Sequence, residues 1–156
     1  MRRRISVIGG GPAGLLAARL LARDHGDWDV TVFERLAPDD TYGFGVGLTR
    51  GLLGALRSAA PAIHDDLLAG CTSFSSASFS LPAAVVELPS YHAGAISRAR
   101  MLRLLLDRAQ QSGVRVELGE APELEHLRRA SDLVIAADGV SSVVRERFAE
   151  QFGASE

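Results

Sequence analysis

Two apolar runs near the N-terminus flank a segment with helical periodicity. Residues 4–8 and 29–34 are rich in β-branched side chains, which favours buried strands. Residues 12–23 carry apolar side chains at helical spacing, and Pro12 stands where a first-turn proline is tolerated. A strand, a helix and a strand in this order predict a βαβ unit with parallel strands and a right-handed crossover.

The middle of the chain departs from this alternation. A glycine-containing loop with a turn at 38–40 is expected over 36–47, followed by a helix from Arg50 to Ala60 that Pro61 ends. Two extended runs around Pro82 predict a β-hairpin within 72–88.

The βα pattern then returns. Ser97 is the expected N-cap of a long helix over 98–111, which Gly113 closes. Further strands are expected over 114–118 and 132–137, the second of them buried because it is an uninterrupted apolar run. A short helix or turn is expected over 124–129, and a last helix over 142–151.

These elements predict an α/β fold of the Rossmann-like, dinucleotide-binding type. Its parallel sheet is expected to contain the strands at 4–8, 29–34, 114–118 and 132–137. The stretch 72–95 is expected to be a small β insertion, the start of a second domain, within one domain that spans 1–156.

Composition excludes several classes of function. The 156 residues are 47% hydrophobic and 23% charged, as in a globular chain, and the net charge of -2 gives no electrostatic basis for binding nucleic acid or an anionic membrane. All 17 basic residues are Arg, so a Schiff-base or P-loop lysine is excluded. The four His show no ligand spacing, so no metal site is expected. The single Cys71 fits a reducing, cytoplasmic location, and no apolar run approaches the length of a membrane span.

The first candidate site is the glycine-rich turn between the strand at 4–8 and the helix at 12–23. Gly9, Gly11 and Gly14 fit the G-x-G-x-x-G pattern in the strand–turn–helix context that it requires. Gly9 permits the turn, Gly11 permits a pyrophosphate to approach, and Gly14 permits close packing of the helix. Glu34 ends the next strand, where a carboxylate accepts from an adenosine ribose. The alternative is a turn packed for its own sake, with Glu34 at a solvated strand end.

The second candidate site follows the strand at 132–137. Asp138 and Gly139 come directly after it, and Ser142 opens the next helix. A carboxylate at this edge can accept hydrogen bonds near a bound cofactor. An Asp-Gly turn with Ser142 as an ordinary cap is the alternative.

We call the first candidate site, the glycine-rich turn, the first corner, and the Asp138-Gly139 turn the second corner. Together with Glu34-Arg35 these two corners resemble the class A flavoprotein monooxygenases, the FAD-dependent aromatic hydroxylases. These oxidoreductases use NAD(P)H as co-substrate. By this resemblance the Asp-Gly motif lies near the pyrophosphate and takes part in NAD(P)H use, and Arg98 reaches the flavin phosphates unless it is an ordinary surface arginine. Arg50 has the same two interpretations. The cofactor-binding residues that the resemblance implies are Gly9, Gly11, Pro12, Ala13, Gly14, Glu34, Arg35, Arg50, Arg98, Asp138 and Gly139.

Two further stretches narrow the resemblance. Residues 38–46 and 91–98 are similar to the aryl-CoA hydroxylases of the salicylyl-CoA 5-hydroxylase and 2-aminobenzoyl-CoA monooxygenase type. This similarity implies an aromatic substrate and favours a CoA thioester. His92 lies in the second stretch, where a catalytic or substrate-binding role is weighed against that of a structural loop histidine.

The chain also departs from the family pattern. Members run to more than twice this length, and the family's third motif, a Gly-Asp pair at the flavin ribityl chain, is missing. We therefore expect the FAD-binding N-terminal portion of a monooxygenase, incomplete without the C-terminal half. It is a fragment, one half of a split enzyme with a complementing chain, or a non-catalytic nucleotide-binding subunit, and a homo-oligomer is compatible with each. A flavin-dependent halogenase is disfavoured, because one Trp cannot supply that family's Trp-x-Trp-x-Ile-Pro motif.

Overall fold

The computed structural model describes residues 2–37, 44–89 and 92–152 of the chain. These residues belong to two compact units: unit 1 comprises Met1–Asp40 and Leu105–Glu156, and unit 2 comprises Thr41–Leu104. The turn expected at 38–40 lies outside the described residues, as do residues 38–43 and 91 of the two stretches that resemble the aryl-CoA hydroxylases.

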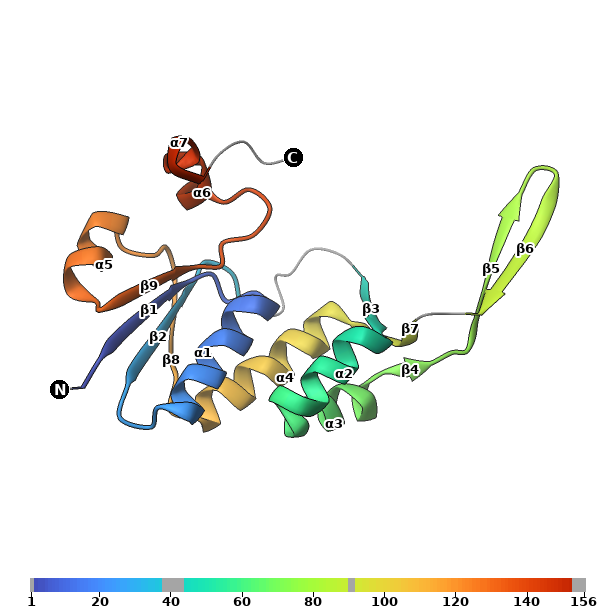
Figure 1. Ribbon diagram of the computed structural model, residues 1–156, viewed down its shortest axis with the longest axis horizontal. Helices are drawn as coiled ribbons and strands as arrows, with labels where there is room; N and C mark the ends of the chain where they lie inside the picture. Colours follow the sequence, from blue (N-terminus) through green and yellow to red (C-terminus); the bar gives the residue numbers. More distant parts are fainter. Residues whose placement is uncertain (1, 38–43, 90–91, 153–156) are drawn as a thin grey trace. The chain divides into compact units, whose positions relative to one another are not determined.

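Unit 1 is built on a four-stranded parallel sheet. Its strands are β1 (Arg4–Ile8), β2 (Asp29–Glu34), β8 (Arg115–Leu118) and β9 (Leu133–Ala136), in the order β8-β2-β1-β9 (Figure 1). The predicted α/β class and parallel sheet are confirmed, and the first two strands have the expected bounds. The carboxyl ends of β1, β2 and β9 therefore lie at one edge of the sheet, where such folds bind ligands.

The two faces of this sheet differ in polarity. Ile5, Val7, Val30 and Val32 alternate onto one face and are at most 2% exposed. Helix α1 (Pro12–Asp24) contacts β1 and β2 and adds further buried side chains to this core. The opposite face carries hydroxyl groups, and α5 (Leu124–Ala130) covers part of it, beside the hydrogen bond of 2.8 Å between Ser6 and Ser131.

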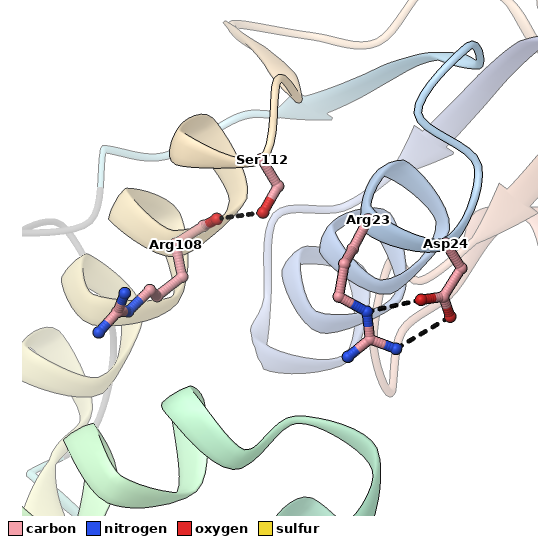
Figure 2. Close-up of polar contacts among 4 residues, drawn as sticks. All are labelled: Arg23, Asp24, Arg108 and Ser112. Atoms are coloured by element: carbon pink, nitrogen blue, oxygen red, sulfur yellow. Dashed lines mark hydrogen bonds and ion pairs between the residues drawn. The ribbon is translucent and has the colours of Figure 1, made fainter.

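Side-chain hydrogen bonds are found at the C-terminal ends of two helices (Figure 2). Arg23 in the last turn of α1 donates to both carboxylate oxygens of Asp24, at 2.5 and 2.9 Å. The Ser112 hydroxyl donates to the carbonyl oxygen of Arg108 at 3.0 Å, which satisfies one of the last carbonyls of α4 (Arg98–Gln111). Gly113 follows with a φ of 86°, so the expected glycine stop is confirmed.

The C-terminal elements of unit 1 differ from expectation in two ways. The helix expected over 142–151 is divided into α6 (Val143–Arg147) and α7 (Ala149–Phe152), because Phe148 adopts a non-helical φ of -111° and ψ of 23°. Strand β9 is not buried as expected: Leu133 is 44% exposed, because β9 is an edge strand that pairs with β1 alone among the described residues.

Unit 2 contains an antiparallel sheet of the order β3-β7-β4 and a separate hairpin. The helices that follow β3 contact each other, and the Ser97 hydroxyl accepts from the backbone N–H of Arg100 at 3.2 Å, which confirms the predicted cap of α4. The elements are β3 (Gly45–Thr49), α2 (Arg50–Ala59), α3 (Pro61–Gly70), β4 (Thr72–Ser73), β5 (Ser76–Leu81), β6 (Ala84–Pro89), β7 (His92–Ser97) and the first part of α4.

Three sequence-based expectations for unit 2 are corrected. The loop expected to reach Gly47 ends earlier, because β3 starts at Gly45 and pairs with β7. Pro61 does end α2, but it also occupies the first turn of α3, where proline is favoured. His92 was expected in a loop and instead opens β7, in register with Thr49.

The predicted hairpin is confirmed as β5 and β6. The register pairs Phe79 with Val86 and Leu81 with Ala84 on one face, and Ser78 with Glu87 on the other. Phe79 and Leu81 are 55% and 59% exposed. The hairpin is therefore a two-stranded ribbon with apolar side chains open to solvent, and Val85, 66% exposed, adds one on the face of Ser78 and Glu87.

Within the described part of the chain, none of the helices is long and apolar enough to cross a membrane.

Candidate functional site

The glycine-rich turn joins the end of β1 to α1, and two of its glycines are required by the protein itself. Gly9 has a φ of 102°, and a Cβ there would lie 2.7 Å from the carbonyl carbon of Ala137 and 3.0 Å from the backbone nitrogen of Asp138. A Cβ on Gly14 would overlap the carbonyl oxygen of Gly9 and come within 3.3 Å of the Ala137 Cβ. The backbone around both positions is thus packed too closely for any side chain.

Gly11 differs from these two glycines. It is the N-cap of α1 with extended backbone angles, and a Cβ there would meet no atom of the described residues within 4 Å. The fold therefore does not require glycine at this position. The first turn of α1 has no side-chain cap and no acidic residue, so none of its own side chains offsets the positive end of the helix dipole. Pro12 and Ala13 form this turn, and Ala13 is exposed.

Glu34 is held against the glycine-rich turn by two hydrogen bonds. One carboxylate oxygen, Oε2, accepts from the backbone N–H of Gly10 at 2.5 Å, and Oε1 accepts from that of Leu36 at 2.8 Å. A Cβ on Gly10 would lie 2.7 Å from the Glu34 Cβ, so Glu34 can pack here only because Gly10 has no side chain. Each oxygen retains a second lone pair for a further donor. Arg35 is exposed at the bend that follows.

Gly10 was missed by reasoning from the sequence. The dinucleotide pattern assigns no role to its second position, so only Gly9, Gly11 and Gly14 were expected to matter. The one available signal was that Gly10 completes an uninterrupted run of three glycines, Gly9 to Gly11, although the pattern requires only two of them.

The second corner lies beside the first. The close approach of Gly9 to the Asp138 backbone places the end of β9 next to the glycine-rich turn. The Asp138 carboxylate oxygen Oδ2 accepts from the backbone N–H of Val144 at 3.4 Å, and Ser142 caps α6 by accepting from Arg145 N–H at 3.0 Å. Gly139 has a φ of 87°, which its lack of a Cβ permits. The Asp138 carboxylate therefore stabilises the turn between β9 and α6.

The local environment holds the Asp138 carboxyl ionised. Partial burial by itself raises its pKa, but hydrogen bonds from the Ser142 hydroxyl and from the backbone N–H groups of Val144 and Val143 outweigh burial and leave the pKa below the ordinary value of 3.8. The corner thus carries a negative charge at neutral pH.

The remaining candidates belong to unit 2. Arg50 is the first residue of α2, after Thr49, and is exposed; Arg98 is the first residue of α4, after Ser97. The β3–β7 register pairs Thr49 with His92 and Gly45 with Ser97. Arg50 and His92 therefore share one end of this ladder, while Arg98 lies at the other end, about 15 Å away along the strands. The structure does not bring the two arginines together.

Metal binding has no support in the described residues, which contain no group of three or more His, Cys, Asp and Glu side chains suited to a metal ion. The chemistry that this site can offer is recognition of a nucleotide by backbone N–H groups, a helix N-terminus and two carboxylates.

Comparison with known sequences confirms the predicted resemblance. A family described as an NAD(P)-binding Rossmann-like domain matches residues 7–37, which contain the end of β1, the glycine-rich turn, α1 and β2. The chain is 38% identical over 152 residues to a 3-hydroxy-4-methyl-anthranilyl-[aryl-carrier protein] 5-monooxygenase of Streptosporangium sibiricum, covering 96% of this chain and 42% of that protein. It is 34% identical over 154 residues to a salicyloyl-CoA 5-hydroxylase of a Streptomyces species, covering 96% of this chain and 29% of that protein.

Solved structures give the same fold. The crystal structure of 2-methyl-3-hydroxypyridine-5-carboxylic acid oxygenase matches 94% of this chain and 42% of its own, with a TM-score of 0.74 and 26% identity. The flavin-dependent halogenase CmlS matches 96% of this chain and 31% of its own, with a TM-score of 0.75 and 24% identity, a likeness of fold alone. The chain spans less than half the length of each of these relatives.

Proposed function

We propose that this chain, which matches part of the aromatic monooxygenases over nearly its whole length, is the FAD-binding portion of an NAD(P)H-dependent flavoprotein monooxygenase that hydroxylates an aromatic substrate. The observation that carries the proposal is the difference among the glycines of the turn. Gly9 and Gly14 are required by the chain's own packing, whereas Gly11 faces open space at an uncapped helix N-terminus. A glycine that the fold does not need fits a ligand whose phosphates approach the backbone closely.

Residues of the two corners would contact different parts of FAD. The first turn of α1 would hold the pyrophosphate with its N–H groups, because no capping side chain accepts hydrogen bonds from them. Glu34 would accept from a ribose hydroxyl with the lone pairs that Gly10 and Leu36 leave free. Bound FAD supplies the redox chemistry, and the protein supplies its orientation and the exclusion of water.

Asp138 and Gly139 would contribute at the edge of the same site. The carboxylate of Asp138 is ionised and fixed by its own turn, so it can orient a hydroxyl or amide donor near the pyrophosphate without rearranging. Arg35, Arg50 and Arg98 are kept in the proposal as partners of the phosphates, on the ground of the family resemblance. His92 is kept as a residue of the substrate side on the same ground.

The names of the relatives point to one substrate class. One relative acts on an anthranilyl group carried by an aryl-carrier protein and the other on salicyloyl-CoA. Both names describe an aromatic acid joined to a large carrier. We propose the same class here, an aromatic acyl group held as a thioester, with turnover requiring the rest of the enzyme on the same or a complementing chain. A homo-oligomer and a cytoplasmic location complete the proposal.

The alternative function is a non-catalytic, nucleotide-binding or complementing subunit. The observation that favours it is the share of the relatives that the chain spans, 42% and 29%. NAD(P)H consumption by the FAD-loaded chain separates the two functions, since a flavin without a closed site still passes electrons from NAD(P)H to oxygen and releases peroxide.

FAD titration of the purified chain tests the proposal. We expect one FAD per chain by absorption and by quenching of flavin fluorescence, and we expect Gly11→Val to remove this binding. Gly26→Val is the matched control, because Gly26 lies beyond the other end of α1 and is equally open to a new side chain. Failure of the wild-type chain to bind FAD, or equal binding by Gly11→Val and the control, would contradict the proposal.

A further inference from the structure

The face of the unit 1 sheet opposite to α1 buries hydroxyl groups where an apolar core would be expected. Ser6 of β1 and Thr31 of β2 are in direct register on this face, and each is only 7% exposed. The Ser131 hydroxyl, at the end of α5, is hydrogen-bonded to that of Ser6 at 2.8 Å. Buried polar side chains are normally hydrogen-bonded, so the bonding capacity left on these groups indicates what the face is suited to bind.

A pocket lies between this face and α5. Its volume is about 250 Å³. Pockets for drug-sized ligands measure about 300–1,000 Å³, so this one suits a single small molecule. Its lining comes from β1, β2, β8 and the segment 122–131, and it includes no residue of the two corners. The pocket is therefore separate from the proposed FAD site.

The lining of the pocket offers several hydrogen-bond donors. The Thr31 hydroxyl accepts from the Arg115 guanidinium at 3.0 Å, and its own hydrogen has no acceptor among the described residues. Ser6 and Ser131 share one hydrogen bond, which leaves one of their two hydroxyl hydrogens for another acceptor. The Arg4 side chain forms no hydrogen bond or ion pair with the described residues. Such donors suit a ligand group that only accepts, and a carboxylate is such a group.

The charges of the lining favour a carboxylate at one end of the pocket. Asp29 forms an ion pair of 2.7 Å with Arg115, so these two charges offset each other. Arg4 is in register with Asp29, whereas Glu117 is in register with Phe33. Phe33 lies four residues further along β2 than Asp29, a distance of about 13 Å. An anionic group is therefore attracted to the Arg4 end and repelled from the Glu117 end.

The Phe33 end of the pocket suits an aromatic ring. Phe33 contributes its own ring there, and the segment that runs from β8 back over the sheet contributes Pro122 and Leu127. His126 of α5 adds a second ring to the lining. Aromatic rings pack favourably against one another and against such apolar groups.

We propose that this pocket binds a small aromatic carboxylate. The carboxylate accepts from Arg4, from the Thr31 hydroxyl and from the Ser6–Ser131 pair, and the ring packs beside Phe33. The site does not rest on the proposed function. It touches the same strand as the first corner, because the Phe33 carbonyl oxygen accepts from the backbone N–H of Gly9 at 2.8 Å.

Isothermal titration calorimetry of the purified chain with benzoate tests the proposal. We expect one benzoate per chain, with at least about tenfold weaker binding of benzamide, which lacks the charge, and of acetate, which lacks the ring. Arg4→Gln should weaken benzoate binding about tenfold, because it removes a charged donor. Arg3→Gln is the matched control: Arg3 lies over the Trp28 ring at 5.5 Å and outside the pocket lining, so the affinity should change less than about twofold.

Backbone amide chemical shifts provide a second readout, which needs no variant. Benzoate should shift the amides of Thr31 and Phe33 and leave that of Ala13, in the first turn of α1, unchanged. Absence of saturable binding, equal affinity for benzoate and benzamide or acetate, equal effects of Arg3→Gln and Arg4→Gln, or the largest shifts in the first turn of α1 would overturn the proposal. FAD binding is measured separately, so the failure of either proposal leaves the other standing.

Discussion

Substitution by alanine should have different consequences at two glycines of the turn: at Gly14 it should lower the stability of the fold, and at Gly11 it should lower the affinity for FAD. In Gly14→Ala the new Cβ would overlap the carbonyl oxygen of Gly9, a backbone atom that cannot move alone. Overpacking costs about 1–3 kcal/mol, and this overlap belongs at the upper end. The higher helix propensity of Ala returns about 1 kcal/mol. A net loss of about 2 kcal/mol should lower the Tm by roughly 4–8 °C in a chain of this size.

Gly11→Ala should leave the fold nearly unchanged. The φ of -68° and ψ of 176° suit any residue, and in the described part of the chain the new Cβ meets no atom within 4 Å. The poorer N-cap costs less than about 1 kcal/mol. The Cβ would occupy the space through which the pyrophosphate approaches, so FAD affinity should fall about 100-fold, or about 2.7 kcal/mol.

Thermal unfolding followed by circular dichroism and FAD titration, applied to both variants, give the two readouts. Gly14→Ala should show a lower Tm than the wild type. Gly11→Ala should bind FAD more weakly while its Tm stays close to that of the wild type. Wild-type affinity in Gly11→Ala would refute the interpretation of Gly11 as the ligand-facing glycine. An equal loss of Tm in both variants would refute the assignment of the three glycines to different tasks.

Three further predictions follow from the hydrogen bonds. Glu34→Gln replaces one acceptor of a backbone N–H with a donor and should lower the free energy of unfolding by about 1–3 kcal/mol in urea titrations, whereas an unchanged midpoint would contradict the two contacts. Because the folded pKa of Asp138 is lowered, its carboxylate stabilises the fold above pH 3.8, and this contribution is lost as the pH falls through the folded pKa. Asp138→Asn should therefore lose less stability than the wild type when the pH is lowered from 5 to about 2, and parallel curves would argue against this role. Ser97→Ala should lower the unfolding free energy by about 1 kcal/mol through the lost cap of α4, with Ser58→Ala, an exposed change in the last turn of α2, as the control.

Local signals account for the parts of the fold that the sequence predicted. β1, α1 and β2 carry their own periodicity and turn residues, and Ser97 marks the start of α4. The missed strand β7 has the sequence His-Ala-Gly-Ala-Ile-Ser, which is poor in β-branched residues and becomes a strand through antiparallel pairing with distant β3. Helix α3 was missed because Pro61 ends one helix and begins the next.

The candidate site divides in the same way. The positions of Gly9, Gly11 and Gly14 follow from a strand–turn–helix pattern that is local in sequence. The contact between Gly10 and Glu34 could not be predicted from the sequence, because it depends on the register of the parallel strands β1 and β2. The placement of Arg50 and Arg98 at opposite ends of one ladder depends on an antiparallel register that no local pattern encodes.

The β5–β6 ribbon has a consequence for the order in which the chain folds. Its two strands are joined between Leu81 and Ala84, so the hairpin can close within microseconds and needs no distant part of the chain. An isolated two-stranded hairpin is only marginally stable in water, and in this one Phe79 is 55% exposed. We therefore expect the apolar side of this hairpin to attract chaperones and proteases during synthesis until another surface covers it.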